Sequence, residues 1–228
     1  MASAINVLEE LKGLADPEKL DGMAGFGMSV AKRLGISIPV LRSLAKKIGR
    51  NHALALTLWK SGYAEARILA SMIAEPEELT GKQIAMMVRD FDSWDVCDQV
   101  CMNLFEHSTL ACSSIEQWAT SDEEFVRRAA FALIACLAWH DKSAPDSQFI
   151  RFLGLVRQAA LDDRNFVKKS VNWALRNIGK RSLALNKKAI IVAKEIQKDD
   201  SKSARWIAAD ALRELSGEKT LERIKRTR

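Results

Sequence analysis

The chain has 228 residues, of which 48% are hydrophobic and 28% are charged, and its formal net charge is +6. This composition is that of a globular protein long enough to bury its own core, and it excludes a disordered or collagen-like chain. No run of about 18 uncharged apolar residues occurs, so we expect neither a membrane-spanning helix nor a membrane partner.

The N-terminal segment and the cysteines indicate the compartment. Met1 to Gly13 carries Glu9, Glu10 and Lys12 where a signal peptide needs an apolar run, so we expect no secretion signal. The four cysteines match neither a disulfide framework nor a zinc signature. We therefore expect a cytoplasmic protein without metal or other cofactor, the alternative being a metal site at the cysteines near His107.

Apolar residues recur at helical spacing along most of the chain, and no segment alternates as a strand does. Only four prolines and eleven glycines interrupt the pattern. Helices are predicted, in chain order, over Ala2–Ala15, Pro39–Gly49, His52–Ser61, Ala64–Ala74, Gly81–Asp90, Trp94–His107, Ser114–Thr120, Asp122–Trp139, Ser147–Leu161, Asn165–Gly179, Leu185–Lys198 and Lys202–Leu215. The glycine-rich segment Asp21–Ile38 gives no clear pattern.

The predicted helices form pairs that resemble one another. Residues 124–130 match residues 165–171 at an offset of 41, and residues 174–178 match residues 211–215 at an offset of 37. A period of about 40 residues made of two helices is typical of HEAT-like repeats. The sequence therefore predicts an all-α fold, a right-handed superhelix of antiparallel helix pairs with a concave groove.

We expect a single domain. N-terminal helices would occupy about residues 1–50, helix-pair repeats residues 51–217, and a basic tail residues 218–228.

Positive charge is concentrated at the C-terminal end. From Arg164 to Arg228 there are 18 Lys/Arg against 7 Asp/Glu, whereas the first 163 residues hold 17 against 22. Such a distribution is typical of a face that binds a polyanion, and it predicts that the concave groove is basic. The alternative is a solvated surface that ends in a charged tail.

The helix that begins at Trp94 carries a carboxylate in an unusual place. Helical spacing puts Asp98 in the middle of an apolar stripe with Trp94, Met102 and Phe105. A lone carboxylate there is unfavourable unless it lines a cleft or pairs with a partner such as Arg128. Asp98 is therefore a candidate catalytic residue, and a buried structural aspartate is the alternative.

Trp173 lies at the edge of a cationic strip on the helix Asn165–Gly179, beside Lys169, Arg176 and Lys180. An indole among basic side chains can stack on a base or a sugar while the cations bind phosphates. The alternative is an amphipathic tryptophan that covers the edge of the core.

Basic pairs recur at the start of successive repeats, which favours a shared role in binding phosphate over isolated surface charges. The candidate DNA-binding residues are Arg127, Lys168, Lys169, Arg176, Lys180 and Arg205.

Taken together, these residues resemble the AlkD-like DNA alkylation repair family of HEAT-like repeat DNA glycosylases. Residues 94–98, Trp-Asp-Val-Cys-Asp, are similar to the family's Trp-Asp-x-x-Asp element. Residues 125–128, Phe-Val-Arg-Arg, resemble a helix start that ends in an arginine, and residues 169–176 resemble a Lys-x-x-x-Trp-x-Leu-Arg element. The likeness extends from about Phe26 to Leu215.

The resemblance implies a monofunctional glycosylase that hydrolyses the N-glycosidic bond of cationic N3- or N7-alkylated purines in double-stranded DNA. It implies that Asp98 is the catalytic carboxylate, that Trp94 and Trp173 flank the sugar of the damaged nucleotide, and that Arg128 holds a backbone phosphate. We expect a monomer. The alternative is a non-catalytic HEAT-like module that binds structured DNA, RNA or another protein.

One position departs from the family, which has a tyrosine shortly before a Gly-Ile step. Aligning on Gly35-Ile36 puts Phe26 at that place, so the ring is kept and the hydroxyl is lost. We expect Phe26 to close the cleft beside Trp94 or Trp173.

Overall fold

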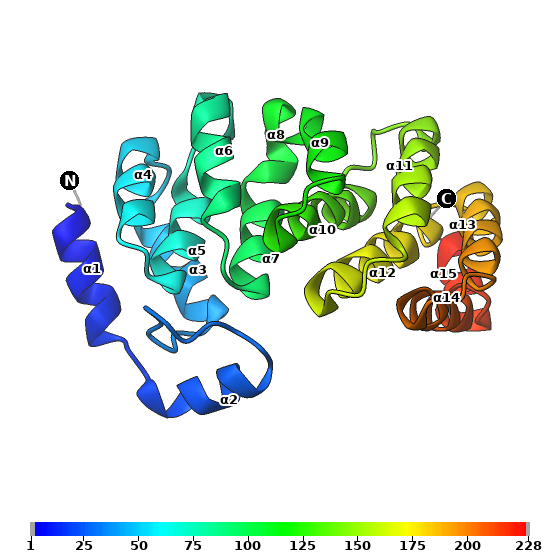
Figure 1. Cartoon of the computed structure of the whole chain (residues 1–228). Helices are drawn as coiled ribbons and strands as arrows, with labels where there is room; N and C mark the ends of the chain where they lie inside the picture. Colours follow the sequence, from blue (N-terminus) through cyan, green and yellow to red (C-terminus); the bar gives the residue numbers. More distant parts are fainter. Residues whose placement is uncertain (1–2, 227–228) are drawn as a thin grey trace. The chain divides into compact units, whose positions relative to one another are not determined.

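The computed structural model describes residues 3–226, which fold into helices joined by turns and by one longer loop, residues 26–37, with no strand in the described range (Figure 1). The chain divides after Cys112 into two compact units. The helices up to this division are α1 (Ala4–Gly13), α2 (Leu20–Gly25), α3 (Ile38–Ile48), α4 (His52–Lys60), α5 (Ala64–Ile73), α6 (Gly81–Arg89) and α7 (Trp94–Asn103). The division falls within the short helix α8 (Thr109–Ser113). The helices after it are α9 (Ile115–Ala119), α10 (Glu124–His140), α11 (Asp146–Ala159), α12 (Asn165–Gly179), α13 (Leu183–Ile196), α14 (Lys202–Leu215) and α15 (Glu218–Arg226).

The first unit is built around α5, which packs against α4, α3 and α7 (Figure 1). Its core contains a chain of aromatic contacts in which the Phe91 ring lies 6.1 Å from Trp59 and 6.2 Å from Phe105, centroid to centroid. Tilted and edge-on rings at these separations are favourable arrangements in a core. The core therefore fixes the position of α7, which carries two of the predicted site residues.

The second unit contains the pairs α9–α10, α11–α12 and α13–α14, followed by α15, which packs against α13 and α14 (Figure 1). The second helices of the pairs lie side by side, α12 against both α10 and α14. Phe125 and Phe166, which occupy equivalent positions in successive repeats, stack with ring centroids 5.4 Å apart. The HEAT-like repeat that the 41-residue offset predicts is thus confirmed.

Some of the helices begin where a side chain satisfies free N–H groups of the first turn. Asn51 caps α4, Ser182 caps α13 and Ser201 caps α14, and Thr80 and Gln83 form a reciprocal capping box on α6. Because caps and helical spacing are local features, most predicted helices agree with the structure within a few residues.

Three segments differ from the prediction. The predicted helix Trp94–His107 ends at Asn103, because Leu104 leaves the helical conformation with φ −132°. Two short helices, α2 and α8, were not predicted. The predicted basic tail is helical over Glu218–Arg226 and buries Ile224.

Gly179 is the last residue of α12, and the close packing of a neighbouring helix explains why a glycine stands there. A Cβ atom there would lie 2.6 Å from Cδ1 of Leu215 on α14. The missing side chain lets two neighbouring repeats approach closely.

Among the described residues, no helix is long and apolar enough to cross a membrane. The single domain, the right-handed superhelix and its basic concave groove stay predictions.

Candidate functional site

Two predicted site residues lie on α7. Trp94 is the first residue of the helix and Asp98 follows one turn later, so both face the same side. The buried face of α7 is formed by Val96, Cys97, Val100 and Cys101, whereas Trp94 and Asp98 are half-buried. The expectation that Asp98 lies in the middle of an apolar stripe is therefore wrong.

Asp98 instead lies at the edge of the buried face. Helical spacing alone misplaced the centre of that face, because Met102 is only half-buried and Phe105 lies beyond the end of the helix. Asp98 is consequently half-buried rather than enclosed in the core.

The backbone of Phe26 contacts the first residue of α7. The indole N–H of Trp94 donates a hydrogen bond of 3.1 Å to the carbonyl oxygen of Phe26. The Phe26 side chain itself is 75% exposed. The structure thus brings the predicted cleft residue beside Trp94, with its ring open to solvent rather than packed in the core.

A buried ion pair that the sequence analysis did not identify fixes this contact. The guanidinium of Arg33 binds both carboxylate oxygens of Asp95, at 2.8 and 2.9 Å, and its Nε donates to the carbonyl of Ser29 at 2.6 Å. The hydroxyl of Ser93 accepts from the backbone N–H of Ser29 at 3.2 Å. Phe26 is therefore held near α7 by the segment that follows it.

Asp95 belongs to the Trp-Asp element, to which the resemblance gives a role only for Trp94 and Asp98. Of the two partners, only Arg33 stands out in the sequence, as the one arginine of the glycine-rich segment Asp21–Ile38. Helical spacing could not identify Asp95 as the residue that pairs with it.

A second anchor holds the end of the same segment. The fully buried carboxylate of Glu65 on α5 accepts hydrogen bonds from the backbone N–H groups of Leu34 at 2.9 Å, Gly35 at 2.8 Å and Ile36 at 3.3 Å. Hydrogen bonds of this kind compensate the loss of hydration of a buried carboxylate.

Gly35 is required at the centre of this anchor. Its φ is +78°, and a Cβ atom would lie 2.2 Å from the carbonyl oxygen of Asp16. The Gly-Ile step on which Phe26 was aligned is therefore a structural requirement of the loop.

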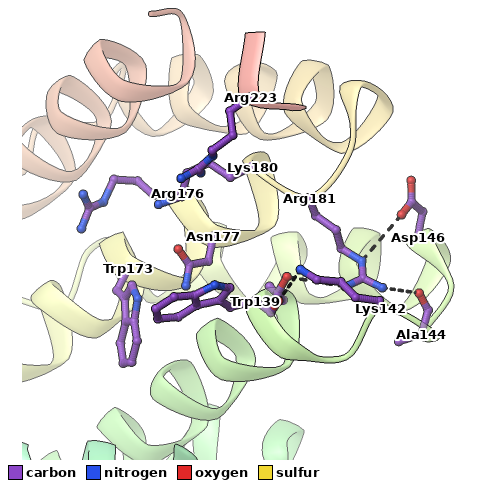
Figure 2. A pocket seen from close by; sticks show the side chains of 11 residues that line it. Trp139, Lys142, Ala144, Asp146, Trp173, Arg176, Asn177, Lys180, Arg181 and Arg223 are labelled. Atoms are coloured by element: carbon purple, nitrogen blue, oxygen red, sulfur yellow. Dashed lines mark hydrogen bonds and ion pairs between the residues drawn. The ribbon is translucent and has the colours of Figure 1, made fainter. Parts of the chain in front are cut away.

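The second unit contains a cleft of about 780 Å³, which we call the basic cleft (Figure 2). It is lined by two tryptophans, Trp139 of α10 and Trp173 of α12, and by one carboxylate, Asp146. Its cations come from the end of α12, from the turn after α10 and from α15. They are Lys142, Arg176, Lys180, Arg181 and Arg223.

Two predicted DNA-binding residues in the basic cleft are held by a carboxylate of α14. Glu214 accepts from Arg176 at 2.6 Å and from Lys180 at 2.8 Å, and Arg176 also lies 3.5 Å from Asp210. Burial would raise the pKa of Glu214, but the hydrogen bonds from Lys180 and Arg176 lower it below its ordinary value. These cations are thus fixed in place, and part of their charge is neutralised.

The first basic pair is largely structural in this geometry. Arg127 donates to the carbonyl of Ala119 at 2.9 Å and to the carboxylate of Asp162 at 2.8 Å. Arg128 is only 5% exposed and donates to the carbonyl of Phe166 at 2.6 Å.

The other predicted cations lie nearer to solvent. Lys169 is exposed on α12, and the ammonium of Lys168 lies 5.2 Å from the centre of the Trp206 ring. Arg205 is exposed and pairs with Asp200 at 2.7 Å. Lys168 and Arg205 thus contact other side chains of the chain, whereas Lys169 is simply exposed to solvent.

The structure therefore groups the predicted residues by unit. Phe26, Trp94 and Asp98 come together in the first unit, and Trp173, Arg176 and Lys180 in the second. Arg33, Glu65 and Trp139 were not among the residues that the sequence predicts for the site. Among the described residues, no group of three or more His, Cys, Asp or Glu side chains could hold a metal ion.

Comparisons with known proteins agree with this fold. A solved structure described as "a new family of proteins related to the HEAT-like repeat DNA glycosylases with affinity for branched DNA structures" superposes with a TM-score of 0.77 at 20% identity, covering 93% of this chain and 95% of the other. A designed armadillo repeat protein (TM-score 0.37, 16% identity, 80% and 82% covered) and an engineered protein (0.40, 15%, 92% and 99%) superpose less well.

No curated protein sequence matches the chain. A family model described as "DNA alkylation repair enzyme" matches residues 7–215, which is nearly the whole chain. The chain therefore belongs to the DNA alkylation repair enzyme family.

Proposed function

We propose that the protein is a monofunctional DNA glycosylase that excises cationic N3- or N7-alkylated purines from double-stranded DNA. The observation that carries the proposal is the pairing of a half-buried carboxylate, Asp98, with an indole, Trp94, on one side of α7. The anchored loop that presents Phe26 beside Trp94 supports it, because catalytic groups must be held in a fixed geometry.

The chemistry of the substrate suits these residues. A cationic alkylpurine is already a good leaving group, so bond breaking needs little help from a general acid. Positive charge develops on the sugar as the bond breaks, and a carboxylate such as Asp98 stabilises that charge and can orient the attacking water. Indole faces attract positive charge, which gives Trp94 a role against the sugar.

The phosphate-binding role belongs to the basic residues of the second unit. Lys169 is exposed and suited to contact a phosphate directly. Arg128, whose guanidinium donates to the carbonyl of Phe166, would hold a backbone phosphate. The chain would act on duplex DNA as a monomer in the cytoplasm, without a metal or other cofactor.

A second candidate is a non-catalytic module that binds structured DNA. The burial of Arg128 favours it, because a guanidinium that is 5% exposed offers little surface to a phosphate. The relative of similar fold, whose description names affinity for branched DNA structures, makes branched DNA the first ligand to try.

The decisive experiment compares the wild type with Asp98→Asn in single-turnover release of N7-methylguanine and N3-methyladenine from duplex DNA. We expect the wild type to release both bases. Asp98→Asn should release neither, because it lacks the charge that stabilises the sugar cation. Its affinity for DNA should be equal or slightly higher, since a carboxylate repels phosphate.

Asp92→Asn is the matched control, since Asp92 is an exposed aspartate two residues before Trp94. It should release both bases at the wild-type rate. Excision by Asp98→Asn at that rate would show that Asp98 is structural. A wild type that binds branched DNA and releases no base would establish the second candidate.

A further inference from the structure

The basic cleft contains a tryptophan to which the proposed excision chemistry gives no role. Trp139, near the C-terminal end of α10, is 56% exposed, although a tryptophan of a globular protein normally buries most of its ring. One exposed aromatic is unremarkable by itself. The surroundings of Trp139 make it notable, because it lines a concave site together with a second tryptophan and five cations (Figure 2).

The Trp139 ring is held in a defined orientation. It stacks on the neighbouring His140, with ring centroids 5.0 Å apart and planes 22° apart. The carbonyl of the same residue accepts a hydrogen bond from the ammonium of Lys142, which draws this cation to the rim of the cleft (Figure 2). A fixed aromatic surface binds a stacking partner with less loss of conformational entropy than a mobile one.

Carboxylates hold three of the cations of the cleft in place. Asp146 lies 3.9 Å from Arg181, and Glu214 and Asp210 bind Arg176 and Lys180. Lys142, by contrast, donates to the carbonyl of Trp139, a bond that adds no negative charge.

Arg181 is fixed further in a way that adds no negative charge. Its guanidinium donates to the carbonyl of Ala144 at 2.6 Å and lies 4.3 Å from the centre of the Phe149 ring. Lys142 and Arg223 are exposed cations of the cleft, and their positive charge suits a phosphate group.

We propose that the basic cleft binds an unpaired nucleotide of DNA, whose base stacks on Trp139 and whose phosphates contact Lys142 and Arg223. In a duplex each base is covered by its neighbours, so only an unpaired base can offer a face to the indole. The volume of about 780 Å³ lies in the range of sites for molecules of this size. This proposal rests on the proposed function in that it takes DNA as the partner, and it adds a preference for DNA that contains unpaired bases.

The test measures affinity by fluorescence anisotropy for two labelled DNAs at equal salt concentration, a full duplex and the same duplex with a short single-stranded gap. The wild type should bind the gapped DNA about tenfold more tightly, since stacking of one base contributes about 1–3 kcal/mol. Trp139→Ala should lose most of this preference, and Trp139→Phe should retain most of it because a phenyl ring still stacks.

Charge variants test the contact with phosphate. Lys142→Ala should weaken binding of the gapped DNA several-fold more than binding of the duplex. Lys187→Ala removes an exposed lysine of α13 outside the cleft and should leave the ratio of the two affinities unchanged. Circular dichroism checks that the variants fold; the alanine at position 139 replaces a largely exposed ring, so the fold should be kept.

Equal wild-type affinities for the two DNAs would overturn the proposal, as would Trp139→Ala that weakens both equally. Displacement of the gapped DNA by a micromolar free deoxynucleoside monophosphate would also overturn it, by assigning the cleft to small nucleotides. If the wild type bound neither DNA, the proposed function itself would fail, which is a different result from a lost preference.

Discussion

The Arg33–Asp95 ion pair determines how the start of α7 meets the loop before α3. The Arg33 side chain is 2% exposed and that of Asp95 is 13% exposed, so the pair is shielded from water. Removing one partner of such a pair leaves a buried charge without compensation, which is more damaging than the loss of the attraction itself. This single contact therefore controls the place of Phe26 relative to Trp94.

Asp95→Asn should lower the free energy of unfolding by about 3–5 kcal/mol, because it leaves the Arg33 charge uncompensated. The urea midpoint measures the change. Replacing both residues with apolar ones, as in Arg33→Met with Asp95→Leu, should lose less stability than Asp95→Asn alone. An Asp95→Asn midpoint equal to that of the wild type would mean that the ion pair contributes nothing.

Phe26 variants test the role of the ring beside Trp94. The hydroxyl that Phe26 lacks represents one hydrogen bond of about 0.5–1.5 kcal/mol, or up to about tenfold in rate. Phe26→Tyr should therefore release N7-methylguanine as fast as the wild type or faster, and Phe26→Ala should be slower in single-turnover assays.

The exposed Val30 of the same loop provides the control, since Val30→Ala also removes apolar surface. Val30→Ala should excise at the wild-type rate. If Phe26→Ala did so too, the ring would have no part in the site.

At the scale of helices, the loop before α12 ties three repeats of the second unit together. The Asp162 carboxylate accepts from Arg127 of α10 at 2.8 Å and from Arg164 at 2.6 Å. The hydroxyl of Ser203 on α14 donates to the Asp162 carbonyl at 2.6 Å. Equivalent helices are thus linked through one residue, in addition to their apolar packing.

Asp162→Asn should destabilise the protein by about 2–3 kcal/mol, because hydrogen bonds between charged groups are lost. Burial would raise the pKa of Asp162, but the hydrogen bonds from Arg164 and Arg127 lower it. Since the folded-state pKa lies below the unfolded value of about 3.9, the unfolded state takes up the proton first. The contribution of Asp162 to the free energy of unfolding is therefore complete above the unfolded-state pKa. It is lost as the pH falls from the unfolded-state pKa toward the lower folded-state pKa.

Urea unfolding at a series of pH values measures this effect. Asp162→Asn should show a weaker loss of stability between neutral and acidic pH than the wild type. The neighbouring Asp163 is exposed, so Asp163→Asn should follow the wild-type curve. Identical curves for Asp162→Asn and the wild type would contradict the assignment.

For the whole molecule, the charge distribution predicts a salt-dependent and largely sequence-independent affinity for DNA. Each phosphate contact contributes about −0.9 to the slope of log affinity against log salt concentration. Lys169→Ala should flatten the slope by about this amount, because Lys169 is exposed. Arg176→Ala should flatten it less, since Glu214 already neutralises part of the Arg176 charge.

Anisotropy titrations between low and moderate salt measure these slopes. Lys12→Ala, which removes an exposed lysine of α1 that pairs with Glu9, should leave the slope unchanged. An affinity of the wild type that did not vary with salt would argue against DNA as a partner.

The helices and their repeat followed from the sequence, because amphipathic spacing, caps and turn residues act within one or two helical turns. The placement of Trp94 and Asp98 on one side of α7 followed for the same reason. The depth of Asp98 did not, since spacing within one helix does not reveal which face its neighbours cover.

Only the tertiary structure decided which charges are available. Arg33 meets Asp95 across 62 positions of the chain, and Glu65 holds N–H groups about 30 positions away. The count of 18 basic against 7 acidic residues likewise treats Arg176 and Lys180 as unpaired, although both bind Glu214. Such pairs form because folding brings distant helices into contact, where a buried charge must find a partner, and no local pattern in the sequence records which partner it finds.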